Sequence, residues 1–349
     1  MKFDVIIATY NRRDSLKILV EQILECSCLP EKIIIVDSSI DENQEIQSLD
    51  SVTYVRSSHK NQPYQRYVGY LASSSDVLIY FDDDMRIVDK QCFEKILIPF
   101  NDENVVGVQP NFIYKNNFYD CQIPESKIRQ LAQNNIFFKF LKTLSGNPSI
   151  EDGKLWLAGI RGKSPDNGKS LEWFNGPVFS ARKKYLYNNF NFNLFELYKK
   201  RVGKAEDVIL GFTLSKLGKV IYLEDAYFYH DDQNDSVYSV NFISYSERIS
   251  CSRLYLSFEY ARLSGKSKVL AFFHYHLFIL GRIGCLIANQ FINFERSRFN
   301  IMLGYLRGYF KALLSIKTLI SFDNGFNEKK EALNDLSENP KFIRNPNDK

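Results

Sequence analysis

The sequence predicts an α/β fold in which a mostly parallel sheet is covered by helices on both faces. Short runs rich in Ile and Val alternate with segments of helical periodicity through the first two thirds of the chain. Several of these runs end abruptly in polar residues, as in "IIIVD" and "VLIYFDDD". Ligands of parallel sheets bind at the carboxyl ends of the strands, so a binding site is expected there. The length of 349 residues suits one large domain or two moderate ones.

Each element is expected from its local pattern. The segment 12–26 repeats apolar residues at helical spacing, among them Leu16, Val20 and Ile23. The expected strands cover residues 3–10, 31–39, 51–58, 76–84, 105–114, the first half of 171–186, and 219–230. The expected helices cover residues 12–26, 62–74, 89–100, 134–144, the second half of 171–186, and 205–218. Gly218 is expected to cap the last of these helices.

Three consecutive aspartates follow the run "VLIYF", and they raise the question of what they face. Asp82, Asp83 and Asp84 repel one another, so a cation or a cationic partner is expected beside them. A solvated acidic loop explains an isolated triple aspartate equally well. Thr9 and Asp37 end two other expected strands, and the three placements on one edge of the sheet favour a ligand site.

Five short motifs carry a resemblance to a known family. They are "ATYNRRDSL", "IIIVDSS", "NQPYQRYVGY", "YFDDDM" and "AEDVILGFTLSKLG", in this order. From Met1 to about His230 the chain therefore resembles family 2 glycosyltransferases. The resemblance implies the GT-A fold, a nucleotide-sugar donor, a divalent metal and inversion at the anomeric carbon.

The resemblance also implies a metal site. It makes Asp84 the ligand from the Asp-any-Asp motif and Asp82 its companion at the metal or the ribose, and it assigns no role to Asp83. His230 closes an expected strand, and relatives often complete the metal site with a histidine there; a surface histidine at a strand end is the alternative. Carboxylates cannot stabilise an anionic diphosphate directly, whereas Mn²⁺ or Mg²⁺ between them reverses the sign of the interaction.

Two acids open the expected helix at 205–218. The resemblance implies that Asp207 is the catalytic base and that Glu206 holds the acceptor. A base must take the proton of the attacking hydroxyl, which a carboxylate can do. The alternative is electrostatic, because acids are common in the first turn of any helix.

The first half of the chain supplies the expected nucleotide contacts. The residues that the resemblance assigns to the nucleotide are Thr9, Tyr10, Arg12, Asp37, Arg66 and Asp82. The residues that it assigns to the sugar and acceptor pocket are Trp173, Asn175 and Gly176. Trp173 has a second interpretation as a core residue. The sequence departs from the family pattern at Ala8, where proline is usual, and around Arg66, where "QRY" replaces "ARN".

The C-terminal third has a different character. Helices are expected at about 241–264, 266–293 and 297–321, followed by a loose polar tail from Phe322. Residues 261–320 hold nine Lys and Arg and one acid, a net charge of +8. Arg282 interrupts the longest apolar run, so we expect contact with an anionic membrane surface without a crossing. A solvated helical subdomain is the alternative.

The expected organisation has three parts: residues 1–235 form the nucleotide-sugar-binding and catalytic domain, 236–321 the basic helical region, and 322–349 the polar tail. The net charge of +4 is too small to indicate nucleic acid. Six scattered cysteines indicate free thiols rather than a zinc site, and no signal peptide is expected.

These observations predict a metal-dependent, inverting glycosyltransferase that uses a UDP-sugar, the commonest donor of the family. It would extend a lipid-linked surface glycan, such as capsule or lipopolysaccharide, on the cytoplasmic face of the membrane. The main alternative is a non-catalytic nucleotide- or sugar-binding protein that retains the fold, which would not need a base at Asp207. A sugar-phosphate nucleotidyltransferase would need a glycine-rich phosphate loop after the first strand, where "ATYNRRDSL" has no glycine.

Overall fold

The computed structural model describes residues 1–114, 136, 150–231, 241–292, 294–315 and 326–338. The helix expected at 134–144 lies outside the described residues, apart from Ile136.

The centre of the fold is an eight-stranded sheet with the order β3-β2-β1-β4-β9-β6-β10-β5. Its strands are β1 (Phe3–Thr9), β2 (Lys32–Asp37), β3 (Val52–Arg56), β4 (Val77–Asp82), β5 (Met85–Ile87), β6 (Val105–Tyr114), β9 (Val178–Arg182) and β10 (Lys219–His230). The first four in chain order are parallel to one another, whereas β9 and β5 are antiparallel to their neighbours. A separate two-stranded sheet pairs β7 (Leu155–Trp156) with β8 (Ile160–Arg161).

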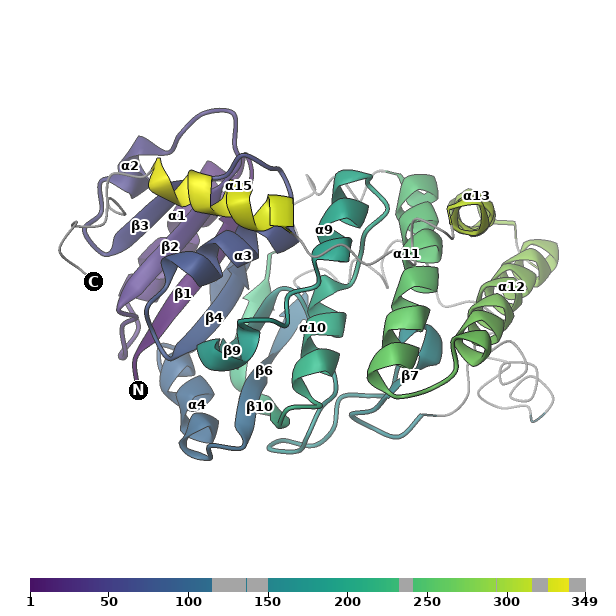
Figure 1. Cartoon of the computed structure of the whole chain (residues 1–349), viewed down its shortest axis with the longest axis horizontal. Coiled ribbons are helices and arrows are strands. Elements are labelled where there is room, and N and C mark those ends of the chain that lie inside the picture. Colours follow the sequence, from purple (N-terminus) through teal and green to yellow (C-terminus); the bar gives the residue numbers. More distant parts are fainter. Residues whose placement is uncertain (115–135, 137–149, 232–240, 293, 316–325, 339–349) are drawn as a thin grey trace.

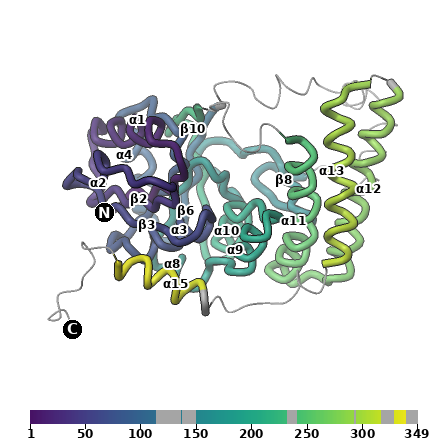
Figure 2. Tube along the Cα trace, turned by 90° about the horizontal axis from the view of Figure 1, so that it is seen from above, coloured from purple at the N-terminus to yellow at the C-terminus, as the bar shows by residue number. Residues whose placement is uncertain are grey.

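Helices cover both faces of the sheet because its strands are apolar on both sides. Val5 and Ile7 of β1 join one buried cluster, and Ile6 between them joins the other. The elements that follow the strands are α1 (Arg13–Leu24), α2 (Gln44–Gln47), α3 (Gln62–Ala72), α4 (Cys92–Leu97), η1 (Ile98–Asn101), η2 (Leu157–Gly159), α8 (Lys183–Leu186), α9 (Phe192–Lys199) and α10 (Glu206–Leu214). Figure 2 shows α1 and α4 on one side of the sheet and α3 on the other. The predicted fold class, a mostly parallel sheet between helices with a helical C-terminal region, is confirmed.

Three long helices form the C-terminal region: α11 (Phe242–Leu263), α12 (Lys268–Ile292) and α13 (Arg296–Leu314). Figures 1 and 2 show α12 and α13 at the end of the molecule opposite β3. Two glycines let α13 approach α11 closely. A Cβ on Gly304 would lie 2.3 Å from the carbonyl oxygen of Ile243, and one on Gly308 would lie 2.4 Å from that of Glu247.

Two local expectations were wrong. Helix α10 ends at Leu214 with Ser215 as its C-cap, so Gly218 is not the cap. Gly218 instead lies where the chain turns against the edge of β6: a Cβ there would meet the carbonyl oxygen of Asn104 at 2.5 Å and Cγ1 of Val106 at 2.4 Å.

The second error concerns the tail, which was expected to be loose but contains a helix. Residues Phe326–Ser337 form helix α15, which lies across α3 (Figure 1). Ala332 and Leu336 are buried, and they lie four residues apart on one face of this mostly polar helix. The Asp335 carboxylate accepts hydrogen bonds from Ser58 N at 3.0 Å and from Tyr64 Oη at 2.9 Å. The contacts depend on a distant part of the chain, so the local polarity of the tail gave no sign of them.

We predict that Asp335→Ala lowers the free energy of unfolding by about 1–3 kcal/mol, because the substitution leaves the buried Tyr64 hydroxyl and the partly buried Ser58 amide without their acceptor. Chemical denaturation measures the change. Lys330→Ala, an exposed position on the same helix, is the control and should change little. Equal stability of Asp335→Ala and wild type would mean that the Asp335 hydrogen bonds do not stabilise the fold.

Candidate active site

The register of the sheet brings several predicted residues to one edge. Thr9 pairs with Asp37, and Asp37 pairs with Arg56, at the carboxyl ends of β1, β2 and β3. Asp82 ends β4 opposite Ala8. Four consecutive parallel strands therefore end at the same level, and their polar terminal residues share one rim of the sheet.

Asp82, Asp84 and His230 form a three-residue cluster at this rim. One ligand atom from each lies within 4.8 Å of the other two. Strand pairing explains the arrangement: β5 begins at Met85 just after the acidic turn, and Met85 pairs with His230 at the end of β10. The Asp231 amide also donates to the Asp84 carbonyl oxygen at 2.9 Å.

The cluster has the electrostatics of a cation site. Burial raises the pKa of Asp82 to about 7, with Asp84 contributing in the same direction and Arg66 opposing. Oδ1 of Asp84 is buried without a hydrogen bond and lies 3.3 Å from Nε2 of His230. Two carboxylates and an imidazole are ligands that Mn²⁺ accepts, and the carboxylates also suit Mg²⁺, so these residues fit a divalent cation.

The middle aspartate faces elsewhere. Asp83 accepts a hydrogen bond from Thr9 Oγ1 at 2.7 Å and one from Arg12 Nη1 at 2.9 Å. Arg12 also contacts Asp84 Oδ2 at 2.5 Å, and the Ser15 hydroxyl donates to the Asp83 carbonyl oxygen at 2.9 Å. Thr9 and Arg12, which the sequence assigned to the nucleotide, thus hold the acidic turn in this structure.

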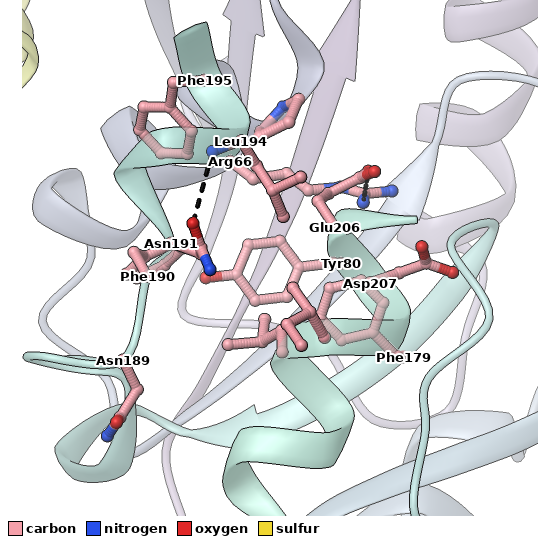
Figure 3. A pocket seen from close by; sticks show the side chains of 13 residues that line it. Arg66, Tyr80, Phe179, Asn189, Phe190, Asn191, Leu194, Phe195, Glu206 and Asp207 are labelled. Carbon is pink, nitrogen blue, oxygen red and sulfur yellow. Dashed lines mark hydrogen bonds and ion pairs between the residues drawn. The ribbon is translucent and has the colours of Figure 1, made fainter. Parts of the chain in front are cut away.

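Arg66 connects the cluster to helix α10. Its Nη2 donates to Asp82 Oδ1 at 2.8 Å and to the Gly176 carbonyl oxygen at 2.7 Å. Its Nη1 donates to Glu206 Oε1 at 2.8 Å, and the Tyr198 hydroxyl donates to the other oxygen of the same carboxylate. Figure 3 shows the Arg66–Glu206 pair beside the rings of Tyr80 and Phe179.

Asp207 follows Glu206 in the first turn of α10. The residue before them, Ala205, has a left-handed backbone with φ 65°, which is uncommon for a residue with a side chain. Burial raises the pKa of Asp207 to about 6, with Glu206 contributing, and Arg161 and Arg66 acting in the opposite direction. This carboxylate is therefore more basic than an ordinary aspartate.

Tyr10 and Asp37 lie at the β1–β2 part of the rim. The Asp37 carboxylate accepts hydrogen bonds from Ser39 N at 2.7 Å and from the Tyr54 hydroxyl. The Tyr10 ring lies under the Lys60 ammonium, 3.2 Å from the ring centroid. Neither residue contributes to the acidic cluster, although both are on the same edge.

The predicted sugar and acceptor residues separate into two groups. Asn175 and Gly176 line a cavity of about 850 Å³ that Glu206 and Asp207 also line. Trp173 is not among the residues lining this cavity; it is buried in the core, where a Cβ added to Gly211 of α10 would touch its backbone. The pocket assignment of Trp173 is therefore corrected to its alternative, a core residue.

The same cavity has basic side chains that the sequence analysis missed. They are Arg161, Lys204, Arg248, Arg253 and Arg282. They come from β8, the segment before α10, α11 and α12, and no common motif connects them. Gln62, which donates to Asp82 Oδ1 at 2.6 Å, was also missed, although it lies inside the quoted motif "NQPYQRYVGY".

Comparison with solved structures finds distant similarities. The mannosyltransferase of Pyrobaculum calidifontis, solved with GDP-Man and Mn²⁺, is 11% identical, with 89% of this chain and 87% of that chain covered at a TM-score of 0.46. Glucosyl-3-phosphoglycerate synthase of Mycobacterium tuberculosis, solved with Mn²⁺, UDP and its product, is 11% identical over 76% and 81% at a TM-score of 0.44. Residues 1–349 of S. aureus TarS are 14% identical over 91% of both chains at a TM-score of 0.41. No curated protein matches the chain significantly.

The family comparison is more specific. Residues 4–161 match the family model described as Glycosyl transferase family 2. The match includes the rim of β1 to β4 and the acidic turn, whereas Glu206, Asp207 and His230 lie beyond it. Residues 4–161 are therefore a glycosyl transferase family 2 domain, and the protein that contains this domain is a glycosyltransferase.

Proposed function

We propose that the protein transfers a sugar from a nucleotide diphosphate sugar, with UDP as the nucleotide, to a hydroxyl of a glycan, with inversion at the anomeric carbon. One observation carries the proposal: Arg66 joins Asp82 of the acidic cluster to Glu206, the neighbour of Asp207. The residues proposed to bind the donor and those proposed to bind the acceptor are thereby held next to each other.

The donor side is assigned to the acidic rim. Asp82, Asp84 and His230 would hold Mn²⁺ or Mg²⁺, and the cation would supply the positive charge that a leaving diphosphate requires. Tyr10 and Asp37, farther along the rim, are assigned to the nucleotide with Thr9, Arg12 and Arg66.

The acceptor side is assigned to Asp207. The acceptor oxygen forms a bond to the anomeric carbon on the face opposite the diphosphate, while the bond from that carbon to the diphosphate oxygen breaks. The nucleoside diphosphate leaves with the bonding electrons, and the hydroxyl proton moves to the Asp207 carboxylate. Glu206 is already held by Arg66 and Tyr198, so it is suited to positioning the acceptor rather than taking its proton.

The acceptor is proposed to be a growing, lipid-linked surface glycan at the cytoplasmic membrane face. By length and composition, Lys268–Phe291 of α12 could span a membrane, since an 18-residue stretch within it has a mean hydropathy of 1.6. Five of its exposed apolar residues follow one stripe at spacings of four and seven: Val269, Phe273, Leu280, Ile287 and Phe291. This stripe supports contact with a lipid surface more directly than the basic residues do.

The basic residues of the helical region are partly neutralised. Arg298 is buried and paired with Glu295 at 2.5 Å, so it cannot face lipid. Arg307 and Lys311 lie 3.5 and 2.9 Å from carboxylate oxygens of Glu247. The net charge of +8 therefore overstates the attraction to anionic lipid.

The metal assignment predicts that Asp84→Asn and His230→Ala weaken Mn²⁺ binding in the presence of UDP by about tenfold or more, because each removes a ligand. Electron paramagnetic resonance of free Mn²⁺ measures the affinity. Asp76→Ala, an exposed aspartate at the other end of β4, is the control. Unchanged Mn²⁺ affinity in both cluster variants would place the metal elsewhere.

The base assignment predicts that Asp207→Asn lowers turnover by about 10² or more while donor binding survives. Release of nucleoside diphosphate measures turnover, and calorimetry with UDP and Mn²⁺ measures donor binding. Asp166→Asn, in an exposed loop, is the control.

The pH profile supplies a second readout of the same prediction. The Asp207 carboxylate must be ionised to accept a proton, so kcat/KM should fall as the pH drops below about 6. The charged and titratable groups that interact electrostatically with this carboxylate are Glu206, Arg161, Arg66 and Tyr260. A non-catalytic binding protein would show neither turnover nor this profile. Turnover that persists in Asp207→Asn, with donor affinity lost, would move Asp207 to the donor site.

The membrane assignment predicts that the double variant Phe273→Glu and Phe291→Glu no longer floats with phosphatidylglycerol vesicles, because these side chains are 60% and 88% exposed on the stripe. The control is Leu29→Glu with Ile98→Glu, two exposed apolar residues of the catalytic half. If the wild-type protein does not bind vesicles, the membrane assignment is wrong and the helical region is simply solvated. Binding that resists both the substitutions and high salt would mean that α12 crosses the bilayer.

A further inference from the structure

The cavity beside Asp207 has a strongly basic wall. Its volume of about 850 Å³ lies in the range of small-molecule sites. Five of its lining residues are cationic, namely Arg161, Lys204, Arg248, Arg253 and Arg282. The carboxylates that line it are Glu206 and Asp207, and Glu206 is already paired with Arg66.

Three of these arginines form no ion pair with any carboxylate among the described residues, although the Asp207 carboxylate is near enough to interact with Arg161. In the part of the chain that the structure describes, no carboxylate lies within 4.0 Å of Arg161, Arg253 or Arg282. Arg161 donates to the Asn175 side-chain oxygen at 2.5 Å, and Arg253 donates to the Ala158 carbonyl oxygen at 2.5 Å. Both acceptors are neutral, so these bonds fix the guanidinium groups without compensating them.

The three guanidinium groups also lie near one another. Burial lowers the pKa of Arg253, and the positive charges of Arg161 and Arg282 add to this effect. Arg253 is positioned by packing over the Phe278 ring, 4.8 Å from its centroid. Holding like charges together costs free energy, which an anion bound among them would recover.

We propose that this cavity binds the acceptor substrate through a phosphate group. A carboxylate carries one charge and is satisfied by one bidentate arginine, whereas a phosphate carries up to two charges and has more oxygens to accept hydrogen bonds. Arginines that converge from β8, α11 and α12 match the larger anion.

The position of the cavity favours a phosphate of the acceptor, although the cavity also reaches Gln62, which donates to Asp82. Asp82, Asp84 and His230, which are assigned to the donor diphosphate, do not line it, whereas Asp207 does. A phosphate on the arginines leaves another part of the same molecule beside the Asp207 carboxylate, where a hydroxyl is required. In this respect the inference rests on the proposed function.

Calorimetry with two phosphate compounds tests the inference. Glycerol 3-phosphate represents a phosphate in a soluble glycan, and farnesyl diphosphate in detergent represents a lipid-linked diphosphate; glycerol is the uncharged control. EDTA is present throughout, so that the acidic cluster has no metal with which to hold phosphate. We expect one or both phosphates to bind the full-length protein, and the tighter of the two identifies the source of the phosphate.

Variants locate the binding. Arg253→Gln and Arg282→Gln should each weaken it by about tenfold or more, since each loses a charged hydrogen bond. Arg282 is exposed, so its variant is expected to fold even if Arg253→Gln does not. Arg307→Gln, at an arginine of α13 whose side chain is 67% exposed, should bind as wild type. Absence of binding by both phosphates, or binding that Arg282→Gln leaves unchanged, overturns the inference.

This outcome is separable from that of the proposed reaction. Phosphate binding that depends on the arginines supports the site even if Asp207→Asn retains turnover, a result that would overturn the assigned base alone. If Asp207→Asn loses turnover but neither phosphate compound binds, the proposed reaction stands. The proposal that the acceptor carries a phosphate is then wrong.

Discussion

A single buried guanidinium fixes the geometry of the candidate active site. Arg66 is 4% exposed, and a charge so buried is tolerated only with partners around it. Its partners are Asp82 at the end of β4, Glu206 at the start of α10, and the Gly176 carbonyl oxygen. Removing any one of them would leave the charge partly uncompensated, so the donor rim and the acceptor helix are held at a fixed separation.

Helix α3 can place Arg66 there because of two local features. Asn61 caps its first turn by accepting a hydrogen bond from the Tyr64 amide, which starts the helix at the rim of the sheet. Gly69 then lets the helix lie directly on β1, since a Cβ there would come within 2.4 Å of Ile6 Cγ2. The side chain of Gln65, one residue before Arg66, donates to the Thr9 carbonyl oxygen at 2.9 Å and fixes the helix to the strand.

The sequence predicted the parts of the site that depend on local patterns. Asp82 and Asp84 follow an apolar run, and the end of a buried parallel strand is where such residues meet a ligand. The contact of His230 with Asp84 depends on the pairing of β10 with β5, more than 140 positions apart in the chain, and only the family resemblance suggested it. The sequence could not predict the direction in which a side chain points. Trp173, for example, is buried in the core. The sequence could not predict the basic wall of the cavity, because its residues come from separate elements with no shared spacing.

In the helical region, a count of charges along the sequence also misses how folding pairs them. The count of +8 treats all nine basic residues as one surface, but folding assigns them different partners. Arg298 is buried with Glu295, Arg262 pairs with Glu259, and Arg282 lines the cavity.

Arg282 also gives the interrupted apolar run of α12 a different meaning. A charge within an apolar helix is costly at the centre of a bilayer, but it is well placed where that helix forms one wall of a polar cavity. The apolar stripe of the same helix is exposed, so its residues are not required by the core. A helix with one side on the acceptor cavity and an apolar stripe left outside can contact a lipid surface while it contributes to substrate binding. Under the proposals made above, both features of α12 would serve the same acceptor, one that carries a phosphate near its reacting hydroxyl and is anchored in lipid at its other end.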